Sequence, residues 1–138
     1  MAVRLDISAF KRVQFGGASG EGDIPLAGLN WSTAAFAMQI RANPGDTGTA
    51  LVSLATASAG SEGLSASYDS GYTLPDGTVT GATTLRIQIN EATMEALAAA
   101  ARTSEPVNLF YDIHVTPSGS SKRMLCYGKF DVYPGVTI

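Results

Sequence analysis

The sequence has one cysteine, one histidine and only 15% charged residues. A single cysteine excludes an internal disulfide and a cysteine-rich zinc site. The basic residues never occur more than two in a row, whereas nucleic acids and anionic membranes are usually bound by a basic stripe. We therefore expect neither nucleic acid nor membrane as a partner.

Long apolar runs are also absent, since no stretch approaches the ~18 residues of a membrane-spanning helix. The first residues, MAVRLDISAF, lack the charged and apolar blocks of a signal peptide. We expect a soluble protein that is made in a reducing cytosol and not secreted by a signal peptide. The 138 residues, 45% of them hydrophobic, match the size of one domain, residues 1–138, that can bury its own core.

Apolar and polar residues alternate along much of the chain. The pattern is clearest at residues 34–41 and 84–89, and Val3, Leu5 and Ile7 show the same spacing before a break. Alternation with period two predicts half-buried strands. Further strands are expected at 49–55 and 64–68, with a long loop or a loose hairpin at 69–82. Turns recur at intervals near 8–12 residues, so we predict an antiparallel β-sandwich of about seven or eight strands, Ig-like or jelly-roll-like.

One segment favours a helix instead, at about residues 91–101. It is rich in alanine, glutamate and leucine, which are good helix formers. Asn90 is placed to cap its amides, and Met94, Leu97 and Ala101 form one apolar stripe. We expect this helix to cross from one sheet to the other.

The single histidine and the single cysteine lie on the two strands of a predicted hairpin, NLFYDIHVTPSGSSKRMLCYGKFDV. Matching the apolar sets of the strands pairs Ile113 with Cys126 and His114 with Leu125. Cys126 then points into the core and His114 points outward. A nucleophile and its base must come within ~3 Å of each other, so we predict that these two residues form no catalytic pair.

The outward face of this hairpin is less polar than a solvated surface. Such a patch needs a cover, either from the same domain or from a neighbouring subunit, and the sequence leaves both open. We interpret it as a candidate interface. Its residues are Phe110, Asp112, His114, Leu125, Tyr127 and Lys129.

Two other residues of the hairpin have predicted structural roles. Gly128 stands where a core side chain is skipped, which permits a bulge or the close approach of the helix. Tyr111 should lie at the core edge with its hydroxyl bonded to a backbone group.

Other motifs for metal, phosphate or sugar binding are only weakly matched. The spacing of Glu62, Asp69 and Asp76 does not fit a calcium loop, and the glycines of residues 16–22 lack the lysine of a phosphate-binding loop. We predict no catalytic residues, no cofactor, no metal and no enzymatic activity. Trp31, Tyr68 and Tyr72 could form a sugar-stacking platform, although the favoured interpretation of Trp31 is that it anchors the core at the start of a strand.

Several stretches together resemble a known family. They are Asn30–Ser32, Phe36–Arg41, Pro44–Gly45 and Leu51–Leu54, then Leu85–Ile89, Thr93–Leu97, Phe110–Val115 and Leu125–Thr137. This pattern, from near Asp23 to the end, is similar to small β-sandwich proteins of tailed bacteriophages and prophages, such as the N-terminal domain of baseplate upper proteins.

The resemblance implies a virion structural protein of the tail tip, baseplate or fibre-attachment zone. Such a protein acts by protein–protein assembly, as a homo-oligomer and with other virion proteins. The alternative is a carbohydrate-binding β-sandwich module for host-surface recognition.

Overall fold

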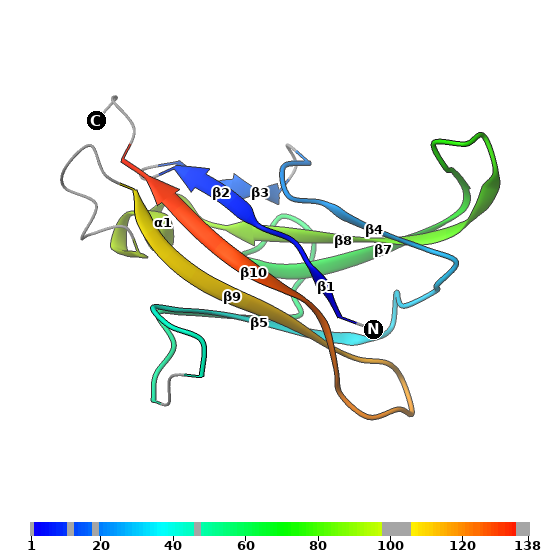
Figure 1. Ribbon diagram of the computed structural model, residues 1–138. Coiled ribbons are helices and arrows are strands. Elements are labelled where there is room, and N and C mark those ends of the chain that lie inside the picture. Colours follow the sequence, from blue (N-terminus) through cyan, green and yellow to red (C-terminus); the bar gives the residue numbers. More distant parts are fainter. Residues whose placement is uncertain (1, 11–12, 18–19, 46–47, 98–105, 135–138) are drawn as a thin grey trace.

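A computed structural model describes residues 2–10, 13–17, 20–45, 48–97 and 106–134, and they form a two-layer β-sandwich (Figure 1). The six-stranded sheet has the order β1-β10-β9-β5-β6, with β2 also paired to β10. Its strands are β1 (Val3–Arg4), β2 (Ile7–Phe10), β5 (Ala35–Arg41), β6 (Val52–Ala55), β9 (Val107–Thr116) and β10 (Arg123–Tyr133).

In the four-stranded sheet, β8 is the central strand and pairs with the other three. The strands are β3 (Phe15–Gly16), β4 (Ile24–Ala27), β7 (Gly63–Thr73) and β8 (Val79–Ile89). The predicted all-β sandwich is confirmed. The described residues contain ten strands rather than seven or eight, because short edge segments such as β1 and β3 carry no alternation of their own.

The core lies between the two sheets and follows the predicted alternation. In β5, Phe36, Met38 and Ile40 are buried while the residues between them are exposed. Strand β8 contributes Leu85, Ile87 and Ile89 from the opposite sheet. Burying large side chains on the facing sides of two sheets is the main stabilising contribution in such a fold.

The N-terminal segment departs from its predicted pattern. It forms two short strands parallel to β10, and they are separated at Leu5 and Asp6. Ile7 is buried as expected, whereas Val3 and Leu5 are exposed. Their period-two spacing predicts a single half-buried strand, but the pairing with β10 is interrupted at Leu5 and Asp6, and β1 is an edge strand.

The helix α1 spans Glu91–Leu97 and connects the two sheets, as predicted. Met94 is fully buried and Leu97 packs against the core. The predicted capping role of the Asn90 side chain is replaced by another contact, since its Oδ1 accepts a hydrogen bond from Gln88 Nε2 at 2.9 Å. Ala101 and the rest of the predicted helix lie outside the described residues.

Residues 69–82 form a hairpin, which was one of the two predicted possibilities. Strands β7 and β8 continue past the body of the sandwich and are joined by a tight turn at residues 74–78, with a bulge between Asp69 and Tyr72. Figure 1 shows this hairpin, in green, projecting beyond the rest of the molecule. Its side chains are exposed on both faces, so the sequence has no alternation here.

Candidate functional site

The β9–β10 hairpin has the predicted register over most of its length and departs from it near the turn. Ile113 pairs with Cys126 as predicted. A β-bulge then inserts one extra residue, Leu125, so that His114 lies opposite Met124. The predicted pairing of His114 with Leu125 is therefore wrong. Leu125 packs against the core. Met124 occupies the position on the outward side that was predicted for Leu125.

Cys126 and His114 lie on opposite faces of the sheet, as the register argument requires. Cys126 is only 4% exposed, and burial raises the pKa of its thiol. His114 is half-buried on the other face, where its Nε2 lies 3.6 Å from Oδ2 of Asp112. The sheet backbone separates the two residues, so the geometry offers no nucleophile–base pair.

The outer face, which we define as the side of the six-stranded sheet that points away from the four-stranded sheet, collects the remaining candidate residues. Directly opposed residues share a face, and three rows of such neighbours cross β5, β9 and β10. The rows are Arg41, Phe110 and Lys129; then Gln39, Asp112, Tyr127 and, from β1, Arg4; then Ala37, His114 and Met124.

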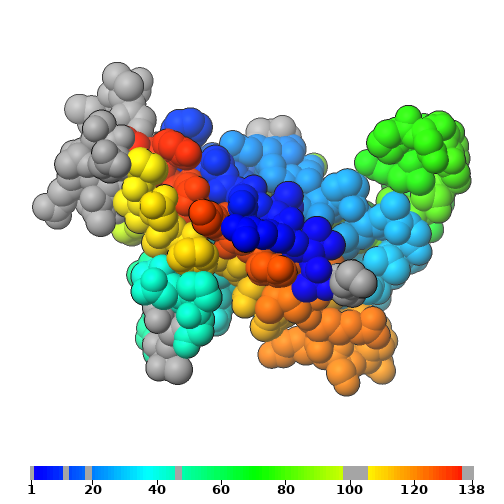
Figure 2. Space-filling model, in the orientation of Figure 1, coloured from blue at the N-terminus to red at the C-terminus, as the bar shows by residue number. Residues whose placement is uncertain are grey.

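A shallow groove of about 410 Å³ runs along this face, and we call it the outer groove. Phe110, Asp112 and Tyr127 line it, with Arg41 and the turn at residues 43–45 on one side and Arg4 and Met124 on the other. Tyr127 is 44% exposed and Met124 39%. In Figure 2 the surface is hollowed between the turn after β5 and the β9–β10 hairpin (orange).

The groove contains three of the six predicted interface residues, Phe110, Asp112 and Tyr127. Met124 and two arginines, Arg4 and Arg41, were not predicted there. Arg41 faces outward in the predicted strand at residues 34–41, so its direction was available from the alternation. Its place beside Phe110 was not available, because it depends on the pairing of β5 with β9. Arg4 reaches the groove only because β1 pairs with β10.

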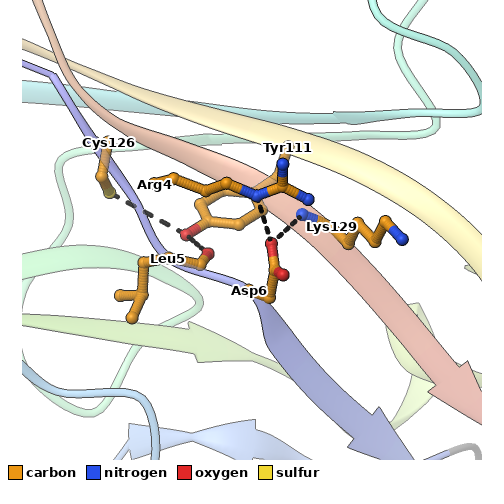
Figure 3. A network of polar contacts seen from close by, with 6 residues as sticks. All are labelled: Arg4, Leu5, Asp6, Tyr111, Cys126 and Lys129. Carbon is orange, nitrogen blue, oxygen red and sulfur yellow. Dashed lines mark hydrogen bonds and ion pairs between the residues drawn. The ribbon is translucent and has the colours of Figure 1, made fainter.

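A network of polar contacts fixes β1 beside the groove (Figure 3). The Leu5 amide donates to the Tyr127 carbonyl at 2.8 Å, and the Tyr111 hydroxyl donates to the Leu5 carbonyl. Asp6 Oδ1 accepts hydrogen bonds from the Lys129 amide at 3.0 Å and from Arg4 Nε at 3.3 Å. These bonds satisfy backbone groups at the break between β1 and β2, where regular strand pairing is interrupted.

Tyr111 has the predicted role, since its ring is buried and its hydroxyl bonds to backbone. Burial raises the pKa of this phenol, so it remains a hydrogen-bond donor at neutral pH. The prediction for Gly128 is right about close approach and wrong about the element. A Cβ on Gly128 would lie 2.5 Å from the Leu5 carbonyl oxygen, so the N-terminal segment, and not the helix, crosses this position.

Asp6 should make the stability of the protein depend on pH. The hydrogen bond from the Lys129 amide, together with Arg4, holds the pKa of the Asp6 carboxyl below its usual value. This stabilisation is present above the unfolded-state pKa of about 3.9 and is lost as the pH falls through the lower folded-state pKa. We expect Asp6→Ala to lower the thermal midpoint at pH 7, and the difference from wild type to shrink below about pH 4.

Asp6→Asn is the matched control, because it keeps an acceptor oxygen for the Lys129 amide and removes the charge. Thermal melts monitored by circular dichroism between pH 7 and pH 2 separate the three proteins. A constant difference between Asp6→Ala and wild type across this range would contradict the assigned role of the carboxylate.

The residues of the alternative sugar site are only partly brought together. Trp31 packs partly against the core, and its amide donates to the Thr83 hydroxyl at 2.8 Å. Thr83 lies directly opposite Tyr68, which is exposed on β7. Tyr72 lies beyond the bulge on the projecting hairpin. Trp31 thus takes the core-anchoring position that was one of its two predicted roles, and the stacking platform stays a prediction.

The acidic residues considered for calcium are spread over different contacts. Glu62 Oε2 accepts a hydrogen bond from the Asn90 amide at 2.7 Å, and Asp76 Oδ1 accepts one from the Thr78 amide at 2.9 Å. Among the described residues, no three histidine, cysteine, aspartate or glutamate side chains gather as a possible metal site. The one described helix is too short to cross a membrane.

Comparison with known proteins leaves the family undetermined. No protein-family model matches the chain, and no curated protein matches it in sequence. The resemblance to phage β-sandwich proteins therefore remains an expectation drawn from the residues themselves.

Proposed function

We propose that this protein is a structural component of a bacteriophage or prophage virion, in the tail tip, baseplate or fibre-attachment zone. It works by binding copies of itself and other virion proteins, without catalysis. The observation that carries the proposal is the outer groove, where exposed Tyr127 and Met124 lie with Phe110 on one open face of a sheet. Aromatic and methionine side chains are enriched at protein interfaces, and contiguous apolar patches on a small domain usually have a partner.

The chemistry of the face supports an interface more than a small-molecule site. The groove is open to solvent and lies across three strands of one sheet, whereas ligand sites are commonly deep and enclosed. Its two arginines each lie beside an aromatic residue of the neighbouring strand, Arg41 beside Phe110 and Arg4 beside Tyr127. Arginine next to aromatic side chains is a common composition of the centre of protein interfaces.

Light scattering and mass photometry of the purified protein over a range of concentrations test this proposal. We expect a mass above that of one chain, or stable complexes when the protein is co-expressed with the products of neighbouring genes. A strict monomer that binds none of those products would overturn the proposal.

The second candidate is a carbohydrate-binding module, and the observation that favours it is the exposed ring of Tyr68 near Trp31. Glycan-array screening of wild type and Tyr68→Ala distinguishes it from the leading proposal. Binding that is lost in the variant would support sugar recognition, while the absence of any bound glycan would leave assembly as the function.

A further inference from the structure

The projecting β7–β8 hairpin has the chemistry of a docking element. We call residues 68–81 the arm. It carries Asp69 and Asp76, and no lysine or arginine occurs between Glu62 and Arg86. Its apolar side chains are exposed, with Val79 62% and Tyr68 42% accessible. Exposed apolar side chains on a projection outside the core are typical of a surface that contacts a partner.

Hydrogen bonds hold the turn at the tip of the arm in one conformation. The Gly77 amide donates to the Leu74 carbonyl at 2.9 Å, and the Leu74 amide donates to the Thr78 carbonyl at 2.8 Å. The Asp76 carboxylate accepts from the Thr78 amide, and this bond lowers its pKa. Asp76 therefore holds the turn and carries a negative charge at neutral pH. A preformed hairpin loses little conformational entropy when it binds.

The outer groove carries a cation that an acidic partner can approach. Arg4, Arg41 and Asp112 are its charged lining residues, and Arg4 is already paired with Asp6 Oδ1 at 3.3 Å. Arg41 bonds to two uncharged oxygens, the Gly48 carbonyl at 3.0 Å and Gln39 Oε1 at 2.9 Å. Its charge is thus available to a carboxylate. An acidic arm with exposed apolar side chains is complementary to a groove that offers this arginine beside an apolar floor.

The arm and the groove of one molecule cannot meet. The arm extends from the four-stranded sheet, and the groove lies on the face of the six-stranded sheet that points away from it. A rigid hairpin would have to pass around the sandwich to reach its own groove (Figure 1). A contact between an arm and a groove would therefore have to join two molecules.

We propose that the arm of one copy docks into the outer groove of a second copy, with Asp76 toward Arg41 and Tyr68 and Val79 toward the apolar floor. This inference rests on the proposed function and names its partner as the same chain. Each copy offers one arm and one groove, so the contact is heterologous. Contacts of this kind close into a ring or continue as a filament, whereas two copies that exchange arms reciprocally would form a two-fold dimer.

Charge reversal on each side of the contact tests the proposal. Arg41→Glu and Asp76→Lys each place like charges at the contact, and each is expected to weaken self-association at least about tenfold, a change of ~1.4 kcal/mol. An equimolar mixture of the two variants restores opposite charges at both contacts. We expect the mixture to regain the wild-type mass in light scattering.

Two further variants serve as controls, one for the change in net charge and one for the hydrogen bond in the turn. Lys122→Glu makes the same change in net charge as Arg41→Glu at the β9–β10 turn, outside the groove, and should leave the mass unchanged. Asp76→Asn keeps an acceptor for the Thr78 amide, so any weakening that it causes reflects charge and not a broken turn. Circular dichroism melts confirm that all four variants are folded.

The outcomes separate this inference from the proposed function. Self-association that neither reversal weakens would place the interface elsewhere and overturn only the inference. The inference would also be overturned if the charge-reversal variants still self-associate but no longer bind another virion protein. The groove would then hold a different partner. A wild-type protein that is strictly monomeric overturns the inference, and it overturns the proposed function only if other virion proteins also fail to bind.

Discussion

Phe130→Ala is expected to lower the free energy of unfolding by about 3–5 kcal/mol, the usual cost of emptying a buried aromatic site. Phe130 is fully buried on β10. Its ring makes edge contacts with Phe15 of the opposite sheet, at 5.7 Å between centroids, and with Tyr111 of its own sheet, at 6.4 Å. Removing it leaves a cavity between the two layers. Because a domain of this size has only about 5–15 kcal/mol of stability in total, the variant should be close to unfolding.

Phe10→Ala is the matched control for this prediction. Phe10 lies on the outer face, is 50% exposed and contacts the ring of Tyr133 at 5.8 Å. We expect it to cost less than about 1.5 kcal/mol, since little of its surface is removed from water. Urea unfolding followed by tryptophan fluorescence gives both values. Equal losses in the two variants would mean that Phe130 is not central to the core.

The core was predictable from the sequence because apolar and polar residues alternate along a strand that has one buried face, and the apolar residues mark that face. Phe36, Met38 and Ile40 show this in β5, and Ile113 with Cys126 shows it in the hairpin. The alternation fails where both faces of a strand are in the same environment. On the arm both faces meet solvent, so Tyr68 and Tyr72 stand among small polar residues with no period, and the segment resembles a loop.

The outer groove was only partly predictable, for two physical reasons. Met124 and Leu125 are adjacent and both apolar, so the sequence gives no sign of which one the bulge leaves outside. The arginines come from strands that are distant along the chain, and only the sheet order brings Arg4 and Arg41 to the two sides of Tyr127 and Phe110. Strand order depends on long-range packing, which local patterns do not encode.

Gly128→Val is expected to displace the N-terminal strand and, with it, one wall of the groove. A Cβ at this position would lie 2.5 Å from the Leu5 carbonyl oxygen and 2.8 Å from Asp6 Oδ1. The first of these is backbone, which cannot turn away as a flexible side chain would. We expect a loss of about 1–3 kcal/mol in the free energy of unfolding, typical of overpacking. We also expect faster hydrogen exchange at the Leu5 amide, because its bond to the Tyr127 carbonyl is broken.

The consequence for assembly follows from the position of Arg4. Displacing Leu5 moves Arg4 from its place opposite Tyr127, so the groove loses one of its two arginines without any change in the groove residues themselves. Self-association should therefore weaken in Gly128→Val while the core remains folded. Gly71→Val is the control for the free energy of unfolding only, because Gly71 lies on the arm; the nearest group to its Cβ is Asp69 Oδ1 at an ordinary 3.7 Å. Normal protection of the Leu5 amide in Gly128→Val, measured by NMR, would show that β1 is not held by this close approach, and the link between the N-terminal strand and the groove would then be lost.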